Sequence, residues 1–115
     1  NFMTGINKNE TETQDKMFLI DFGMARKYID DKTNAHRSNK MRTTGIIGTP
    51  RYVSIHVHDG CEPSRRDDLI SVMYVLVYLV KGRLPWKAAA SPELVAQMKK
   101  QFYQRTYFSK CRRVI

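Results

Sequence analysis

The segment of residues 65–81 constrains the fold most, because its sequence predicts a helix that is apolar on nearly every side. Asp67 and Asp68 stand in its first turn, where negative charge favours the helix dipole, and Gly82 follows as a stop signal. The apolar run from Leu69 to Val80 is shorter than the ~20 residues that cross a bilayer. We therefore expect a central, buried helix and no membrane span.

A strand is predicted upstream of this helix. Met17 to Ile20 form a continuous apolar run, typical of a buried strand, and Gly23 permits a sharp change of direction after it. The short apolar start at residues 2–6 and the polar residues 7–16 indicate a hairpin or a surface loop. From residue 24 to residue 44 the chain is polar and without a period, which predicts a long surface loop.

A second helix is predicted to begin at Ser91, which can cap it, with Pro92 at the first helical position. One stripe of this helix is apolar, and two basic residues lie off the stripe: Leu94, Val95, Met98 and Phe102, against Lys99 and Lys100. His56 and His58 alternate, so on an extended segment they would share a face. A metal site would need further ligands, and we expect structural histidines.

The chemistry of the chain is indicated by Asp21-Phe22-Gly23 directly after the predicted strand. A carboxylate fixed at a strand end suits a site that holds magnesium against phosphates, although a plain turn would also explain it. Further short motifs stand in a fixed order around this triplet: Asn1-Phe2-Met3, Gly48-Thr49-Pro50-Arg51-Tyr52, Asp68 at the start of the apolar helix, and Gly82-Arg83-Leu84-Pro85-Trp86. Their joint order and spacing resemble the protein kinases.

The resemblance can be narrowed within the kinases. Where most kinases have Ala-Pro-Glu, this chain has Val53-Ser54-Ile55-His56, followed by Ser64-Arg65-Arg66-Asp67-Asp68-Leu69. This pattern, like the stretch from Asp21 to Tyr28, resembles the casein kinase I superfamily. The resemblance covers about residues 1–105, and both casein kinase I itself and the tau-tubulin kinase branch stay open.

This resemblance implies the fold class and the domain. The expected fold is α+β and protein kinase-like: a portion of the C-terminal lobe, mainly α-helical, with a short β-hairpin and an activation segment. Residues 1–115 would be a partial kinase domain, from the end of the catalytic loop to the helix after the central one. The N-terminal lobe and the catalytic-base Asp would lie outside it, so we expect the chain by itself to be inactive.

The resemblance also implies which residues hold the cofactors, ATP and Mg²⁺. Asn1 and Asp21 would be the magnesium ligands. Met3 would form the floor of the adenine pocket, and Ile20 would line that pocket just before Asp21.

Two further residues would support catalysis. Thr49 matches the threonine that hydrogen-bonds the catalytic base in serine/threonine kinases. Asp68 would accept backbone N–H bonds from the catalytic loop and so hold that loop in place. Such partners would explain a carboxylate at the mouth of an apolar helix.

The implied function is ATP-dependent transfer of phosphate to serine or threonine of protein substrates. The alternative is a pseudokinase that serves as a scaffold, although a scaffold would not need both metal ligands. Two cysteines without metal-ligand spacing favour a reducing compartment, so we expect a cytoplasmic or nuclear protein.

The charge of +9, from 20 Lys and Arg against 11 Asp and Glu, attracts anions, although a solvated basic face would also explain it. Together with Arg51, this charge favours acidic or already phosphorylated substrates. Arg51 matches a basic residue of the family's anion site. Phe102 stands where the family has a lysine, and Lys99 and Lys100 are the nearby residues that could compensate. No aromatic–basic repeat indicates nucleic-acid binding, so no nucleic acid is expected among the partners.

Overall fold

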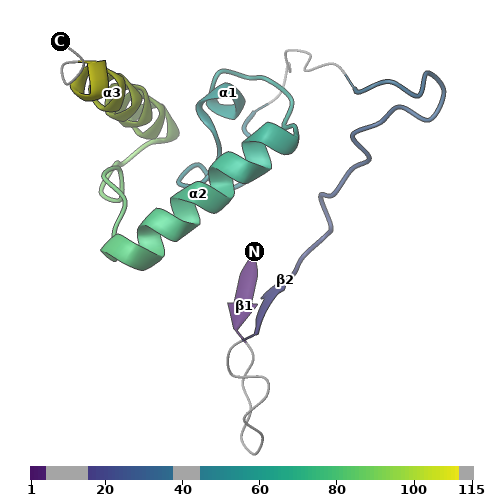
Figure 1. Cartoon of the computed structure of the whole chain (residues 1–115), viewed down its shortest axis with the longest axis horizontal. Coiled ribbons are helices and arrows are strands. Elements are labelled where there is room, and N and C mark those ends of the chain that lie inside the picture. Colours follow the sequence, from purple (N-terminus) through teal and green to yellow (C-terminus); the bar gives the residue numbers. More distant parts are fainter. Residues whose placement is uncertain (5–15, 38–44, 112–115) are drawn as a thin grey trace, which may run out of the picture.

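The structure is a computed structural model that describes residues 1–4, 16–37 and 45–111, without the side chains of residues 105–111 (Figure 1). Its elements, in chain order, are a two-stranded antiparallel sheet and three helices. The predicted mixture of helices with a short hairpin is therefore present. Among the described residues, no helix combines the length and apolar character needed to cross a bilayer.

The predicted hairpin is confirmed by strands β1 (Phe2–Thr4) and β2 (Met17–Leu19). They pair with Phe2 opposite Leu19 and Met3 opposite Phe18. The expectation that β2 is buried is wrong, because every residue of both strands is exposed. The described helices do not cover the hairpin, which projects away from them in Figure 1. The predicted tip, residues 7–16, lies almost wholly outside the described residues.

Residues 24–37 belong to no helix or named strand, as predicted for a long surface loop. Within this segment, Ile29 and His36 form an isolated antiparallel bridge. Residues 38–44, the rest of the predicted loop, lie outside the described part of the chain. The loop leads to the turn at residues 49–53 and from there to the helices (Figure 1).

Helix α1 (Ile55–His58) contains the two alternating histidines. Ser54 caps this helix, because its hydroxyl accepts a hydrogen bond from the Val57 N–H at 3.2 Å. Residues two apart on a helix point in different directions, so His56 and His58 do not share a face. The common face that an extended segment would give these histidines is therefore not formed, because the segment is helical.

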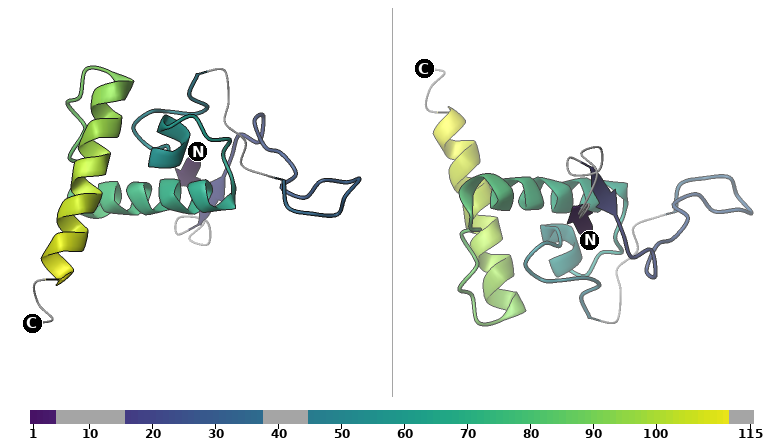
Figure 2. Two further views of the ribbon diagram at one scale, coloured as in Figure 1. Left: turned by 90° about the horizontal axis from the view of Figure 1, so that it is seen from above. Right: turned by 90° about the horizontal axis from the view of Figure 1, so that it is seen from below.

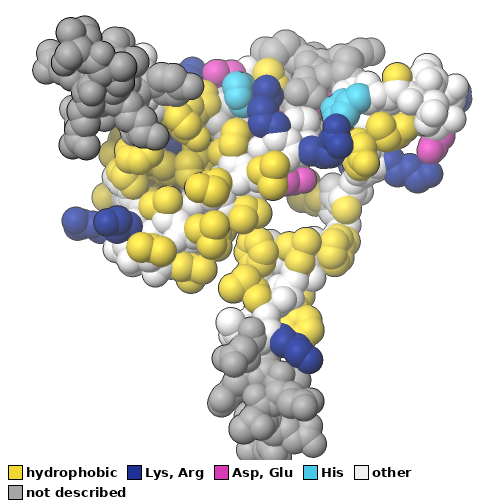
Figure 3. Space-filling model, viewed as in Figure 1, with side chains coloured by type: hydrophobic (Ala, Val, Ile, Leu, Met, Phe, Trp, Pro, Cys, Tyr) yellow, Lys and Arg dark blue, Asp and Glu magenta, His cyan; other side chains and the backbone are white. Residues whose placement is uncertain are grey.

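Helix α2 (Arg65–Lys81) has the predicted bounds. Gly82 ends it with a left-handed φ of 68° and donates its N–H to Tyr78. Its predicted burial is wrong, because only Asp67 and Tyr74 are buried. Described residues cover one side of α2, whereas five large apolar side chains on it remain exposed: Leu69, Met73, Leu76, Leu79 and Val80. Hydrophobic side chains accordingly gather on the surface of the helical part in Figure 3.

Helix α3 (Pro92–Cys111) begins as predicted, since the Ser91 hydroxyl accepts from the Leu94 N–H at 3.3 Å. It lies across α2 in both views of Figure 2. A small apolar core fills the space between α2, the following loop and α3, and consists of Tyr74, Leu84, Trp86 and Val95. The edge-to-face contact of Tyr74 with Trp86, 5.0 Å between ring centroids, lies at its centre.

Candidate active site

The hairpin brings together the two predicted magnesium ligands, which are 20 residues apart in sequence. Asn1 precedes β1 and Asp21 follows β2, so antiparallel pairing places both at the same end of the sheet. The Ile20 N–H donates to the Asn1 carbonyl at 3.0 Å and extends the ladder by one residue. Beyond it, the Asn1 side-chain amide donates to the Asp21 carboxylate at 2.7 Å.

The backbone of Asp21 is in the left-handed region, with φ of 64°. This conformation is uncommon for a residue other than glycine, and such residues concentrate at functional sites. The Gly23 N–H lies 3.4 Å from the second carboxylate oxygen. A Cβ at Gly23 would lie 3.4 Å from that oxygen too. The change of direction predicted at Gly23 is thus made at Asp21, and the backbone N–H of Gly23 contacts the Asp21 carboxylate.

The chemistry of this pair fits a hard cation such as Mg²⁺. Carboxylate and amide oxygens are suitable ligands, and both side chains are exposed. Within the described residues, no group of three or more His, Cys, Asp or Glu could hold a metal ion. Two protein ligands suit magnesium, which commonly takes the remaining ligands from phosphates and water.

The predicted adenine-pocket residues lie on the same hairpin. Met3 is 56% exposed, opposite Phe18 in the sheet, and Ile20 is half-buried beside Asp21. Both side chains are therefore open to contact from outside the described residues. Met3 and Ile20 are close in sequence to Asn1 and Asp21, respectively. The adenine pocket itself stays a prediction.

Thr49 and Asp68, the residues expected to support catalysis, are both exposed. The Thr49 carbonyl accepts from the N–H groups of Tyr52 and Val53, so Thr49 opens a tight turn. Asp68 stands in the first turn of α2. Partial burial and the neighbouring Asp67 raise the pKa of Asp68.

The carboxylate that is buried is Asp67, which the sequence did not single out. It accepts hydrogen bonds from the Ser54 hydroxyl at 2.5 Å and from the N–H and hydroxyl of Ser64, both at 2.8 Å. Burial acts to raise the pKa of Asp67, but these hydrogen bonds together lower it below the usual value. The Ser-x-x-Asp spacing from Ser64 to Asp67 is a capping-box pattern and could have revealed it.

The three predicted anion-site residues have different surroundings. Arg51 is exposed, and its guanidinium has no hydrogen bond or ion pair among the described residues. Lys99 is fully buried, and burial lowers its pKa to about 7. Its Nζ donates to the carbonyls of Pro50 at 2.7 Å and Val53 at 2.6 Å. The expected position of Lys99 off the buried stripe is wrong, and its burial argues against contact with an external anion.

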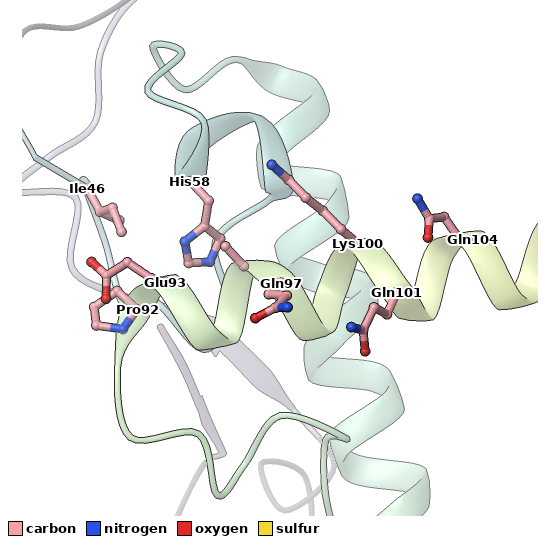
Figure 4. Close-up of a pocket in the computed structure, with 9 residues that line it drawn as sticks. Ile46, His58, Pro92, Glu93, Gln97, Lys100, Gln101 and Gln104 are labelled. Atoms are coloured by element: carbon pink, nitrogen blue, oxygen red, sulfur yellow. The ribbon is translucent and has the colours of Figure 1, made fainter.

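Lys100 is half-exposed and pairs with Asp59 at 2.5 Å. It lines an open groove of about 510 Å³ between α1 and α3. Figure 4 shows His58 directed from α1 toward α3, with Gln97 and Gln101 along the groove. Exposed ion pairs contribute little free energy, so Lys100 can exchange Asp59 for another anion.

His58 has a structural environment. Its Nε2 lies 3.1 Å from the Pro50 carbonyl and 3.2 Å from Lys99 Nζ. Burial, followed by the nearby charge of Lys99, lowers the pKa of His58. A neutral imidazole that faces an ammonium and a carbonyl serves packing, in agreement with the expected structural role.

One comparison with known proteins identifies the family. The family model described as "Fungal protein kinase" matches residues 1–80, which include the hairpin, the Asn1–Asp21 pair, the turn at residues 49–53 and most of α2. The match covers well over half of the 115 residues. Family members of this kind use ATP and a metal to phosphorylate proteins. The chain belongs to the fungal protein kinase family.

Proposed function

We propose that the chain is a portion of an ATP-dependent protein serine/threonine kinase of the casein kinase I superfamily. The observation that carries the proposal is the 2.7 Å contact between the Asn1 amide and the Asp21 carboxylate at one end of the hairpin. The family match supports kinase chemistry, and this contact supports the assignment of two oxygen-bearing side chains as metal ligands.

In this function, Asn1 and Asp21 bind the metal that accompanies ATP. Magnesium, when bound, offsets the negative charge that develops on the transferred phosphate. The left-handed backbone of Asp21 directs its carboxylate back toward Asn1, and the hairpin ladder fixes the distance between them. Met3 and Ile20 provide apolar contact for the adenine ring. Thr49 would orient the catalytic base through its exposed hydroxyl.

The experiment replaces Asp21 by Asn in the intact natural protein and measures turnover with Mg-ATP and a serine peptide. We expect a loss of several orders of magnitude, because the metal contributes several kcal/mol to stabilising the transition state. Asp31→Asn is the matched control: Asp31 is equally exposed and makes only a surface ion pair with Lys27. Near-normal turnover of Asp21→Asn would contradict the assignment. An inactive natural protein that still folds would favour the scaffold alternative.

We further propose that Arg51 binds an acidic or phosphorylated residue of the substrate. It stands in the turn that begins with Thr49, and its guanidinium is exposed without a partner among the described residues. A guanidinium can pair with a carboxylate or phosphate through two parallel hydrogen bonds. Lys100 is the second candidate for this anion site, because its surface pair with Asp59 can be exchanged.

The test compares two matched serine peptides, one with acidic residues near the serine and one with neutral residues. The natural protein should phosphorylate the acidic peptide about tenfold more efficiently, and Arg51→Ala should abolish this preference. Equal efficiencies for both peptides in the natural protein would refute an acidic substrate. A preference that persists in Arg51→Ala would move the anion site to Lys100.

A further inference from the structure

The backbone of residues 50–53 is held in an unusual way. Its four consecutive carbonyl groups each accept a hydrogen bond from a side chain, and the donors come from three places that are distant in sequence. Ser71 belongs to α2, Trp86 to the loop after α2, and Lys99 to α3. The bonds run from Lys99 Nζ to Pro50 (2.7 Å) and Val53 (2.6 Å), from Trp86 Nε1 to Arg51 (2.8 Å) and from Ser71 Oγ to Tyr52 (2.9 Å). The single proton of the Ser71 hydroxyl is shared with the Asp67 carbonyl, which lies 3.0 Å from the same oxygen.

Lys99 makes the largest contribution to this arrangement. An ammonium has three N–H donors, and two carbonyl acceptors, those of Pro50 and Val53, lie beside Lys99 Nζ. His58 Nε2 is 3.2 Å from the same nitrogen and 3.1 Å from the Pro50 carbonyl. The rings of Tyr74 and Trp86 lie 4.9 and 5.2 Å from the same nitrogen. Burying a lysine without partners is costly, and here two carbonyls of the turn accept hydrogen bonds from its ammonium. The side chain is therefore tied to this turn.

The contacts fix the backbone but leave its outward side chains open. Thr49 and Arg51 are both exposed, whereas Val53 and Ser54 are buried. The Arg51 carbonyl is held from the inside by Trp86, which is only 2% exposed. The Arg51 side chain itself is exposed, so its guanidinium is accessible to a ligand. A rigid backbone lowers the conformational entropy that Arg51 would lose on binding an anion.

We propose that Ser71, Trp86 and Lys99 are positioning residues: they clamp the backbone of residues 50–53 so that the Arg51 side chain faces the substrate. Lys99 and Trp86 lie outside the residues that the family model matches. The functional part of this proposal rests on the proposed kinase activity. The structural part, that these side chains immobilise the turn, stands without it.

The main variant is Lys99→Met in the intact natural protein, because methionine keeps the length and the apolar packing of the stem but has no N–H donor. The Michaelis constant for the acidic peptide should rise about tenfold, while that for ATP stays unchanged. The preference for the acidic over the neutral peptide should be lost. Lys87→Met is the control, because Lys87 is exposed in the loop beside Trp86 and its side chain does not contact the turn.

Amide hydrogen exchange tests the clamp directly. The N–H groups of Tyr52 and Val53, which bond to the Thr49 carbonyl, should exchange about tenfold faster in Lys99→Met than in the natural protein and in Lys87→Met. If Lys99→Met fails to fold, Ser71→Ala removes one donor alone and should show smaller changes in the same direction. Ser71→Thr, which retains a hydroxyl, should restore the natural values.

The outcomes separate the two levels of the proposal. Unchanged exchange at Tyr52 and Val53 in both Lys99→Met and Ser71→Ala would overturn the clamp. Faster exchange with an unchanged Michaelis constant and peptide preference would overturn its role in facing Arg51 toward the substrate. If the natural protein phosphorylates neither peptide, the proposed kinase function fails, and the exchange rates still decide whether the clamp exists.

Discussion

Predicted site residues lie in two regions: the end of the hairpin, with Asn1 and Asp21, and the turn of residues 50–53. The two regions differ in how much of the chain packs against them. Every strand residue of the hairpin is exposed, and the Asn1–Asp21 pair is stabilised by a single side-chain hydrogen bond and the sheet ladder. The turn rests on a buried core, with side chains bonded to each of its carbonyls. The turn is thus held by side chains of the described helices and loop, whereas the described residues leave the hairpin uncovered.

The largest test of this contrast compares a core aromatic residue with a hairpin aromatic residue. Trp86→Ala should lower the free energy of unfolding of the chain by about 3–5 kcal/mol, because it leaves a cavity and removes the bond to Arg51. Phe18→Ala should cost less than about 1 kcal/mol, because Phe18 is 47% exposed on the hairpin. Urea unfolding followed by far-ultraviolet circular dichroism measures both. Equal losses would mean that the hairpin packs against the helices.

A smaller effect on stability is expected for Asp67, in the first turn of α2. Asp67→Asn should cost about 1–3 kcal/mol at neutral pH, because a buried acceptor for Ser54 and Ser64 is replaced by a group that also donates. The folded-state pKa of Asp67 is below its unfolded value. Its contribution is therefore fully present above the unfolded pKa and is lost as the pH falls through the folded pKa.

Unfolding measured from pH 6 down to pH 2 should therefore show a steeper loss of stability in the natural chain than in Asp67→Asn. Asp31→Asn is the control, because Asp31 is exposed and forms only a surface ion pair. Parallel pH curves for the natural chain and Asp67→Asn would show that the Ser54–Asp67 contact does not stabilise the fold.

The elements of this chain were predictable where the signal is local. The bounds of α2 follow from the acidic first turn with Asp67 and Asp68 and from Gly82, and the start of α3 follows from Ser91 and Pro92, because such signals act on the nearest turn. The hairpin was indicated by the apolar residues 2–6 and 17–20 on either side of the polar residues 7–16, and the pairing of Asn1 with Asp21 as metal ligands followed from the resemblance. Cap chemistry at Ser54, which produces α1, could have been found in the same way and was missed.

Burial was predicted poorly, because it depends on what lies across each surface rather than on the chain's own pattern. Apolar runs in β2 and α2 indicated burial, yet the described residues cover only one side of α2 and neither strand. Lys99 shows the opposite error: a basic residue was expected at the surface, but distant carbonyls in the turn supply its partners. Such partners, 46 and 49 positions away, carry no local sequence signal.

The smallest expected effect concerns Asp68, which stands next to Asp67 but in the opposite electrostatic situation. Its pKa is raised by partial burial and by the Asp67 charge, so the ionised carboxylate disfavours this fold. The contribution of Asp68 to the free energy of unfolding is therefore fully present below its unfolded-state pKa. This contribution is lost as the pH rises through its folded-state pKa. Asp68→Asn should raise the free energy of unfolding of the chain at pH 7 by less than about 1 kcal/mol, because Asp68 is exposed.

The same substitution in the intact natural protein sharpens the comparison, because there Asp68 is expected to hold the catalytic loop. Turnover by the intact Asp68→Asn protein should fall at least about tenfold, since an amide replaces an acceptor of backbone N–H bonds. The matched control is Asp31→Asn, which should leave turnover unchanged. A gain of stability in the chain with a loss of turnover in the intact protein would identify Asp68 as a residue kept for function at the expense of local stability. Normal turnover would remove it from the candidate site.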